Sequence, residues 1–169
     1  MIKASLSAAI TSTSSEAFSL HEKSLLGEKA NNKIEYMPTE SLFLASEKKL
    51  TFYHNEKPLS EEQALKKIKK QDPRIEEKLV VFSDLRKKGY LVKSALKFGA
   101  DFRVYDKGIR PSEDHARWLV FILKETSSIT PTELAAKNRI AHSTKKKLLL
   151  AIVDSESDVS YYETNWIKI

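Results

Sequence analysis

The chain lacks cysteine, glycine-rich loops and long apolar runs. The absence of cysteine excludes disulfides, thiolate metal sites and a cysteine nucleophile. The longest apolar run, Leu148 to Val153, is far shorter than the ~20 residues that a helix needs to cross a bilayer. The first ten residues contain too short an apolar stretch for a secretory signal. We therefore expect a soluble, cytoplasmic protein with no membrane partner.

The motifs of several enzyme classes are also missing. The sequence has no HExxH, no phosphate-binding Gly-rich loop, no GxSxG and no carboxylates with metal-ligand spacing. We therefore expect no metal and no cofactor. What is present is a globular composition, with 41% apolar residues and 31% charged residues in 169. A net charge of +6 favours an anionic partner, of which nucleic acid is the commonest, although a basic protein without such a partner is equally compatible.

One interruption in the pattern divides the chain into two small domains. Residues 61–70, EEQALKKIKK, read as a helix with Glu first and Lys last, as the helix dipole prefers. Gln71-Asp72-Pro73 breaks it, and a second amphipathic helix is expected from about 74 to 88, ended by Gly89. We therefore predict an N-terminal accessory domain over 1–74 and a C-terminal domain over 75–169.

Both domains are expected to mix helices and strands. In the first, a helix is predicted over 38–45 and a strand over 50–53, and no group of catalytic residues is visible. In the second, Thr130-Pro131-Thr132-Glu133 is a capping box that opens a helix running to about 138. Strands are expected over 90–93, 101–105, 117–123, 148–153 and 159–166. Interleaved elements of this kind predict an α/β (α+β) fold with a central mixed sheet flanked by helices.

The strongest electrostatic feature lies near the end of this second domain. Residues 134–153 contain no acid and carry five cations, which are Lys137, Arg139, Lys145, Lys146 and Lys147. Such a patch binds a phosphate backbone, but it is also compatible with a solvated loop before a strand.

Three residues offer chemistry that RNA cleavage without a metal needs. RNA supplies its own nucleophile, the 2′-hydroxyl, so an enzyme provides a base, an acid and a cation. Tyr105 ends one predicted strand, His115 precedes the next, and Lys146 enters a third. These strand ends are able to meet at one edge of a sheet, although spacing alone does not single out these residues.

Two long segments resemble the signature of archaeal tRNA-splicing endonucleases. They are residues 89–105, GYLVKSALKFGADFRVY, and residues 140–154, IAHSTKKKLLLAIVD. The intervening DKGIRPSEDH has the spacing that the family shows between its tyrosine and its histidine. The resemblance covers residues 75–169 well, and residues 1–74 resemble the accessory domain of the family only loosely.

The resemblance implies a catalytic subunit that excises introns from precursor tRNA at bulge–helix–bulge sites by metal-free transesterification. It implies that Tyr105 accepts the 2′-hydroxyl proton, His115 protonates the leaving 5′-oxygen and Lys146 stabilises the phosphorane. The expected products carry 2′,3′-cyclic phosphate and 5′-hydroxyl ends, and DNA is expected to be inert. A non-catalytic structural subunit, or an RNA-binding module without chemistry, remains the alternative.

The resemblance also points to residues that bind RNA and a partner subunit. Arg139 matches an arginine that holds a flipped base, although a cation near a helix C-terminus explains it equally. Lys145 and Lys147 are expected to contact RNA. The acidic turn, Asp154, Glu156 and Asp158, is the candidate docking loop, and its other interpretation is a polar hairpin turn. Tyr161 and Trp166 in the final strand resemble a dimer interface, or pack on their own core. Either a homotetramer or a heterotetramer with a structural subunit follows.

Overall fold

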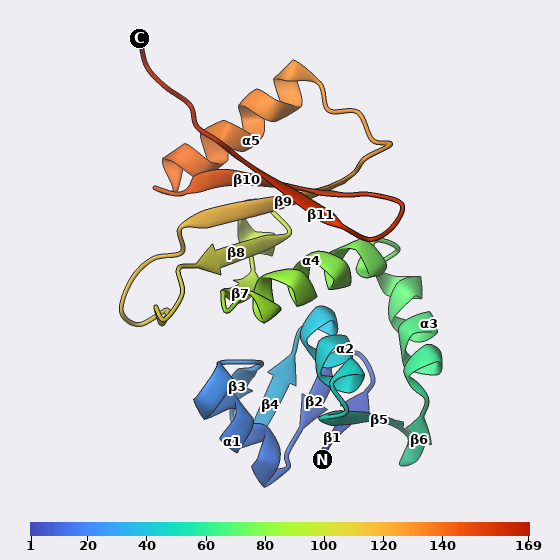
Figure 1. Ribbon diagram of the computed structural model, residues 1–169. Coiled ribbons are helices and arrows are strands. Elements are labelled where there is room, and N and C mark those ends of the chain that lie inside the picture. The colour runs from blue at the N-terminus through green and yellow to red at the C-terminus, as the bar shows by residue number, and fades with distance from the viewer. The chain divides into compact units, whose positions relative to one another are not determined.

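The computed structural model describes residues 1–169, which divide into two compact units, Met1–Leu79 and Val80–Ile169 (Figure 1). The division falls inside helix α4 (Ile75–Lys87). The domain boundary that the sequence predicts near residue 74 lies at the start of this helix and stays a prediction. No helix of the structure is both long and apolar enough to cross a membrane.

The first unit is built on a six-stranded sheet with three helices. The strand order is β3-β4-β2-β1-β5-β6. The strands are β1 (Ile2–Leu6), β2 (Ile10–Ser12), β3 (Glu28–Ala30), β4 (Lys33–Tyr36), β5 (Leu50–His54) and β6 (Lys57–Leu59). The helices are α1 (Ser15–Ser24), α2 (Pro38–Ser46) and α3 (Glu61–Gln71). All pairs are antiparallel except β1 with β5, which are parallel.

Local sequence explains where these helices begin. Pro38 starts α2, and the Glu40 carboxylate accepts a hydrogen bond of 2.9 Å from the Met37 backbone nitrogen. Ser60 caps α3 by accepting from the Gln63 backbone nitrogen, and Gln63 accepts from the Ser60 nitrogen in return. The predicted helix over 38–45 and strand over 50–53 therefore appear, whereas the other strands of this sheet were not predicted.

The second unit is built on a five-stranded sheet of order β11-β10-β9-β8-β7. The strands are β7 (Leu91–Ser94), β8 (Phe102–Tyr105), β9 (Trp118–Lys124), β10 (Lys147–Val153) and β11 (Val159–Thr164). A short 3-10 helix, η1 (Leu96–Phe98), joins β7 to β8, and α5 (Pro131–Ser143) joins β9 to β10. Strands β9 and β10 are parallel and the other pairs antiparallel, so the predicted mixed α/β fold is confirmed.

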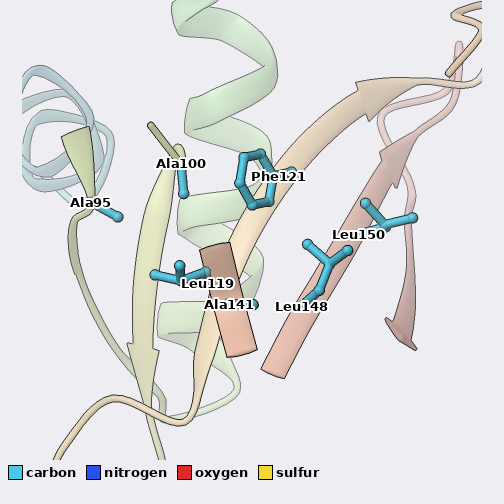
Figure 2. Packing of buried hydrophobic residues seen from close by; sticks show 7 residues of the cluster. All are labelled: Ala95, Ala100, Leu119, Phe121, Ala141, Leu148 and Leu150. Atoms are coloured by element: carbon cyan, nitrogen blue, oxygen red, sulfur yellow. The ribbon is translucent and has the colours of Figure 1, made fainter. Parts of the chain in front are cut away.

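Helices cover both faces of this sheet. On one face, Ala141 of α5 belongs to a buried cluster with residues from β9, β10 and the β7–β8 connection, as Figure 2 shows. The cluster comprises Ala95, Ala100, Leu119, Phe121, Ala141, Leu148 and Leu150. On the other face, Phe82 of α4 lies 5.9 Å from the ring of Phe102 in β8, which pairs with Val120. Because successive strand residues point to opposite faces, α4 and α5 pack on opposite sides.

Two predicted boundaries were wrong. Helix α5 continues to Ser143, five residues beyond the predicted end, so Arg139 lies within it. Strand β11 ends at Thr164, so Trp166 follows the strand instead of closing it. The other boundaries in this unit fall within one residue of their predicted positions.

Candidate active site

The candidate site lies where three strands meet at one edge of the second sheet. Val104 pairs with Trp118 at the end of β8 and the start of β9. Trp118 pairs in turn with Lys147 at the start of β10. Since β8 runs antiparallel to β9 and β9 parallel to β10, the end of β8 and the starts of β9 and β10 share this edge. The register therefore places the backbones of Tyr105, Arg117 and Lys146 side by side.

Two backbone hydrogen bonds extend this alignment past the last strand pairs. The Arg117 nitrogen donates to the Val104 carbonyl, and the Lys147 nitrogen donates to the Arg117 carbonyl, each over 2.9 Å. Tyr105 is buried at the end of β8, opposite Leu91 of β7. Its side chain lies on the same face of the sheet as that of Arg103, two residues earlier.

His115 belongs to the segment that joins β8 to β9. The segment closes at its base through an ion pair of 3.2 Å between Arg117 and Asp106. Ala116, next to His115, is buried, whereas His115 is exposed. The backbone nitrogen of His115 donates to the Asp114 carboxylate over 2.6 Å. The buried neighbour holds the backbone near the sheet edge, and the imidazole is accessible to solvent.

Lys146 is positioned by the way α5 ends. The Lys145 nitrogen donates to the His142 carbonyl over 3.0 Å, and the Lys146 nitrogen to the Ala141 carbonyl over 2.8 Å. With Lys145 in the left-handed region at φ 56°, this is a Schellman motif. The motif usually has glycine at the left-handed position, and its hydrogen bonds fix the Lys146 backbone immediately before β10.

The Lys146 side chain reaches over an aromatic ring. Its Nζ donates to the Thr144 carbonyl over 2.9 Å and lies 5.3 Å from the centre of the Phe98 ring. Burial lowers the pKa of Lys146, and the nearby charges of Arg103 and Lys97 lower it further. The structure thus brings Tyr105, His115 and Lys146 to one edge, without a hydrogen bond between their side chains.

The residues expected to bind RNA differ in whether their charge is already paired with a carboxylate. Arg139 on α5 and Lys145 are exposed. Lys147 instead forms an ion pair of 2.6 Å with Glu163 of β11. Glu163 also accepts a hydrogen bond of 2.8 Å from the Trp118 indole, and these two hydrogen bonds lower the pKa of the Glu163 carboxyl. No sequence pattern points to Glu163 as the partner of Lys147, because 16 residues separate them.

The acidic turn after β10 is organised by its own first residue. One carboxylate oxygen of Asp154 accepts from the backbone nitrogens of Glu156 and Asp158, each over 2.9 Å. The side chains of Glu156 and Asp158 are exposed. The turn therefore presents two carboxylates to solvent, while Asp154 is used to hold its shape.

Tyr161 and Trp166 both contact other parts of their own chain. The Tyr161 hydroxyl donates to Asp84 of α4 over 2.7 Å, and burial together with this carboxylate raises the pKa of Tyr161. Trp166 lies edge-on to His142 at 4.9 Å and is 51% exposed. No sequence pattern identifies Asp84 as the partner of Tyr161, because 77 residues separate them.

Comparison with known proteins matches both units of the chain. Residues 75–161 match the family model of the tRNA intron endonuclease catalytic C-terminal domain, and residues 5–65 match that of the N-terminal domain. A tRNA-splicing endonuclease of Thermococcus kodakarensis is 36% identical over 149 residues, covering 88% of this chain and 87% of that protein. One of Pyrococcus abyssi is 37% identical over 142 residues, covering 84% and 81%. One of Nanoarchaeum equitans is 40% identical over 135 residues, covering 76% and 86%.

Proposed function

The chain belongs to the tRNA intron endonuclease family, and we propose that it excises introns from precursor tRNA at bulge–helix–bulge splice sites without a metal ion. The observation that carries the proposal is the register of β8, β9 and β10, which aligns Tyr105, the segment bearing His115, and Lys146 at one sheet edge. The matched region, residues 75–161, contains all three.

The proposed reaction uses the nucleophile that RNA carries. The Tyr105 oxygen, acting as the general base, takes the proton of the 2′-hydroxyl, and the 2′-oxygen forms a bond to the adjacent phosphorus. As the bond from phosphorus to the 5′-oxygen breaks, the His115 imidazolium gives its proton to that oxygen. The products are a 2′,3′-cyclic phosphate and a 5′-hydroxyl.

Lys146 has the role of stabilising the charge that develops on the phosphorane. A cation contributes most when it is already in place before the reaction, because little reorganisation is then needed. The Schellman motif fixes the Lys146 backbone, and the Thr144 carbonyl and the Phe98 ring hold its ammonium group. Exposed Arg139 and Lys145 are proposed to bind RNA around this centre, with a smaller part for ion-paired Lys147.

Cleavage of an intron-containing precursor tRNA in excess EDTA tests the mechanism. We expect the chain to cut this RNA, to leave cyclic phosphate and 5′-hydroxyl ends, and to leave the all-DNA analogue intact. Replacement of His115 by Ala is expected to lower kcat by about 10²–10⁴, and replacement of Lys146 by Met by about 10²–10³. Tyr105→Phe is expected to act like the histidine variant.

Matched controls keep these comparisons specific. Tyr53→Phe in β5 and Lys67→Met in α3 remove the same groups from residues of the first unit. Both are expected to leave kcat unchanged. A requirement for Mg²⁺, or full activity of the Tyr105, His115 and Lys146 triple variant, would contradict the mechanism.

The assembly is also proposed, as either four copies of this chain or two copies with two of a structural subunit. The two exposed carboxylates at the turn, Glu156 and Asp158, support docking into a basic surface of a second subunit. The same turn pinned by Asp154, together with exposed Trp166, forms the proposed contact surface. The paired substitutions Glu156→Gln and Asp158→Asn are expected to lower the mass measured by light scattering. An unchanged mass would remove the turn from the interface.

A further inference from the structure

A group of cations lies on the face of the second sheet that carries Tyr105. Arg103 is two residues before Tyr105 on β8, so both side chains project from the same face. Lys93 of β7 stands opposite Arg103 in the strand pair and is only 6% exposed. Antiparallel pairs place opposed side chains about 5 Å apart, so two cationic side chains lie next to each other on this face.

Two further cations lie over the ring of Phe98. The Nζ of Lys97 lies 4.9 Å from the centre of the Phe98 ring, and that of Lys146 lies 5.3 Å from it. Phe98 itself packs against the buried cluster under α5. Both ammonium groups therefore lie close to one fixed ring, and the charges of Lys97 and Arg103 both act on Lys146.

Nothing in the fold neutralises Lys97, Arg103 or Lys146. None of the three forms an ion pair with a carboxylate, and the Nε of Arg103 is buried without a hydrogen-bond partner. These cations repel one another: burial lowers the pKa of Lys146, and the charges of Arg103 and Lys97 lower it further. A cluster of like charges in which the Arg103 Nε is buried without a partner costs stability, so the arrangement is explained if an anion completes it.

We propose that Arg103 and Lys97, together with Lys146, bind the phosphate group that is cleaved, with Arg103 donating to one of its non-bridging oxygens. This assignment rests on the proposed function, and it adds two substrate-binding residues to it. The guanidinium fork of arginine suits a phosphate oxygen. A phosphate is favoured over a carboxylate of a second subunit because the group lies beside Tyr105, where the RNA phosphate has to be.

Binding of two uncleavable RNAs tests the assignment. Both carry a 2′-deoxy nucleotide at the splice site, and one has its normal phosphate there while the other has a neutral methylphosphonate. Fluorescence anisotropy gives the Kd of each for the wild type and for Arg103→Met, which keeps the length of the side chain. We expect Arg103→Met to weaken binding of the phosphate RNA by about 10- to 100-fold and to leave the Kd of the methylphosphonate RNA at the wild-type value.

Three further variants serve as controls for this test. Lys97→Met alters an exposed residue and is expected to fold, with a loss of about threefold confined to the phosphate RNA. Lys67→Met removes an exposed cation of α3 and is expected to change neither Kd. Arg103→Lys is expected to restore part of the affinity that Arg103→Met loses, which a purely structural role would not produce.

Three results would overturn the assignment. One is an equal loss with both RNAs, and another is no loss with either. The third is a lower mass of the Arg103→Met protein in light scattering, which would give the cation group to carboxylates of a second subunit. Failure of the wild type to cleave unmodified RNA, even with a structural subunit supplied, would instead overturn the proposed function, and cleavage is measured in a separate assay.

Discussion

Removing the Tyr161 hydroxyl tests whether Tyr161 stabilises its own chain or a contact with another subunit. The hydroxyl donates to an Asp84 carboxylate oxygen over 2.7 Å, and the same oxygen binds Lys88 Nζ over 2.7 Å. Lys88 Nζ also lies 5.1 Å from the centre of the Tyr161 ring. The three side chains therefore contact one another where β11 lies against the C-terminal end of α4. Tyr161→Phe removes the hydrogen bond to Asp84 and keeps the aromatic ring.

The expected cost follows from the charge of the acceptor. Hydrogen bonds to charged groups contribute about 1.5–3 kcal/mol, but the side chains of Asp84 and Lys88 are 31% and 51% exposed, so water competes. We therefore expect Tyr161→Phe to lower the free energy of unfolding by about 1–2 kcal/mol. For a chain of this length, that corresponds to a fall in Tm of about 2–8 °C.

The loss has a characteristic pH dependence. Burial, and then the Asp84 carboxylate, raise the pKa of Tyr161, so the folded state favours the neutral phenol. Stabilisation from a raised pKa is complete below the ordinary tyrosine value of about 10, and it declines as pH rises above that value. The wild type therefore loses this stabilisation above about pH 10, whereas the phenylalanine variant has none to lose. The difference in Tm between the two proteins is expected to narrow between about pH 9 and 11.

Thermal unfolding followed by circular dichroism at these pH values is the assay. Tyr162→Phe is the control, because Tyr162 is the next residue of β11, is 55% exposed and forms no hydrogen bond through its hydroxyl. Its Tm is expected to match the wild type. Equal stability of Tyr161→Phe and the wild type at pH 8, accompanied by a lower mass in light scattering, would show that Tyr161 acts between subunits and would refute this reasoning.

Three more substitutions test the packing, the helix cap and an ion pair of the second unit. Leu119→Ala empties a fully buried position of the cluster in Figure 2 and is expected to cost about 2–5 kcal/mol in urea unfolding. Thr130→Ala removes the N-cap of α5 and is expected to cost about 1 kcal/mol by the same measurement. Glu163→Gln removes a carboxylate whose pKa is lowered by hydrogen bonds from Lys147 and Trp118. Stabilisation from a lowered pKa is present above the ordinary value and lost in acid, so the wild type is expected to lose more stability than the variant between about pH 5 and 3, measured by acid titration.

Sequence patterns located the long elements of the second unit because their signals are strong. The apolar run 117–123 became β9 (Trp118–Lys124), and the capping box at Thr130 opened α5 as predicted. In the first unit, β2, β3 and β6 have three residues each. A run of three cannot display an alternation of period two, so such strands are defined by their neighbours in the sheet.

Other features depended on contacts that a sequence does not display. The predicted end of α5 was too early because no glycine marks it, and Lys145 adopts the left-handed conformation in its place. The hydrogen bond from Tyr161 to Asp84 joins two elements that are far apart in the chain. The three proposed catalytic residues were found through strand ends and family resemblance, whereas Arg103 gained significance only when the structure placed its charge near that of Lys146.

The cations around the sheet edge differ in whether a carboxylate neutralises them. Lys147 is neutralised by Glu163, and Arg117 by Asp106, although both lie within a few residues of the proposed catalytic groups. Lys146, one residue from Lys147, has no carboxylate partner and is held by a carbonyl, an aromatic ring and the end of a helix. A carboxylate at this point would hold the lysine equally well, but it would compete with a phosphate for its charge. Fixing the cation by neutral groups keeps its charge available for the phosphate that we propose it binds, on the face of the sheet on which Tyr105 lies.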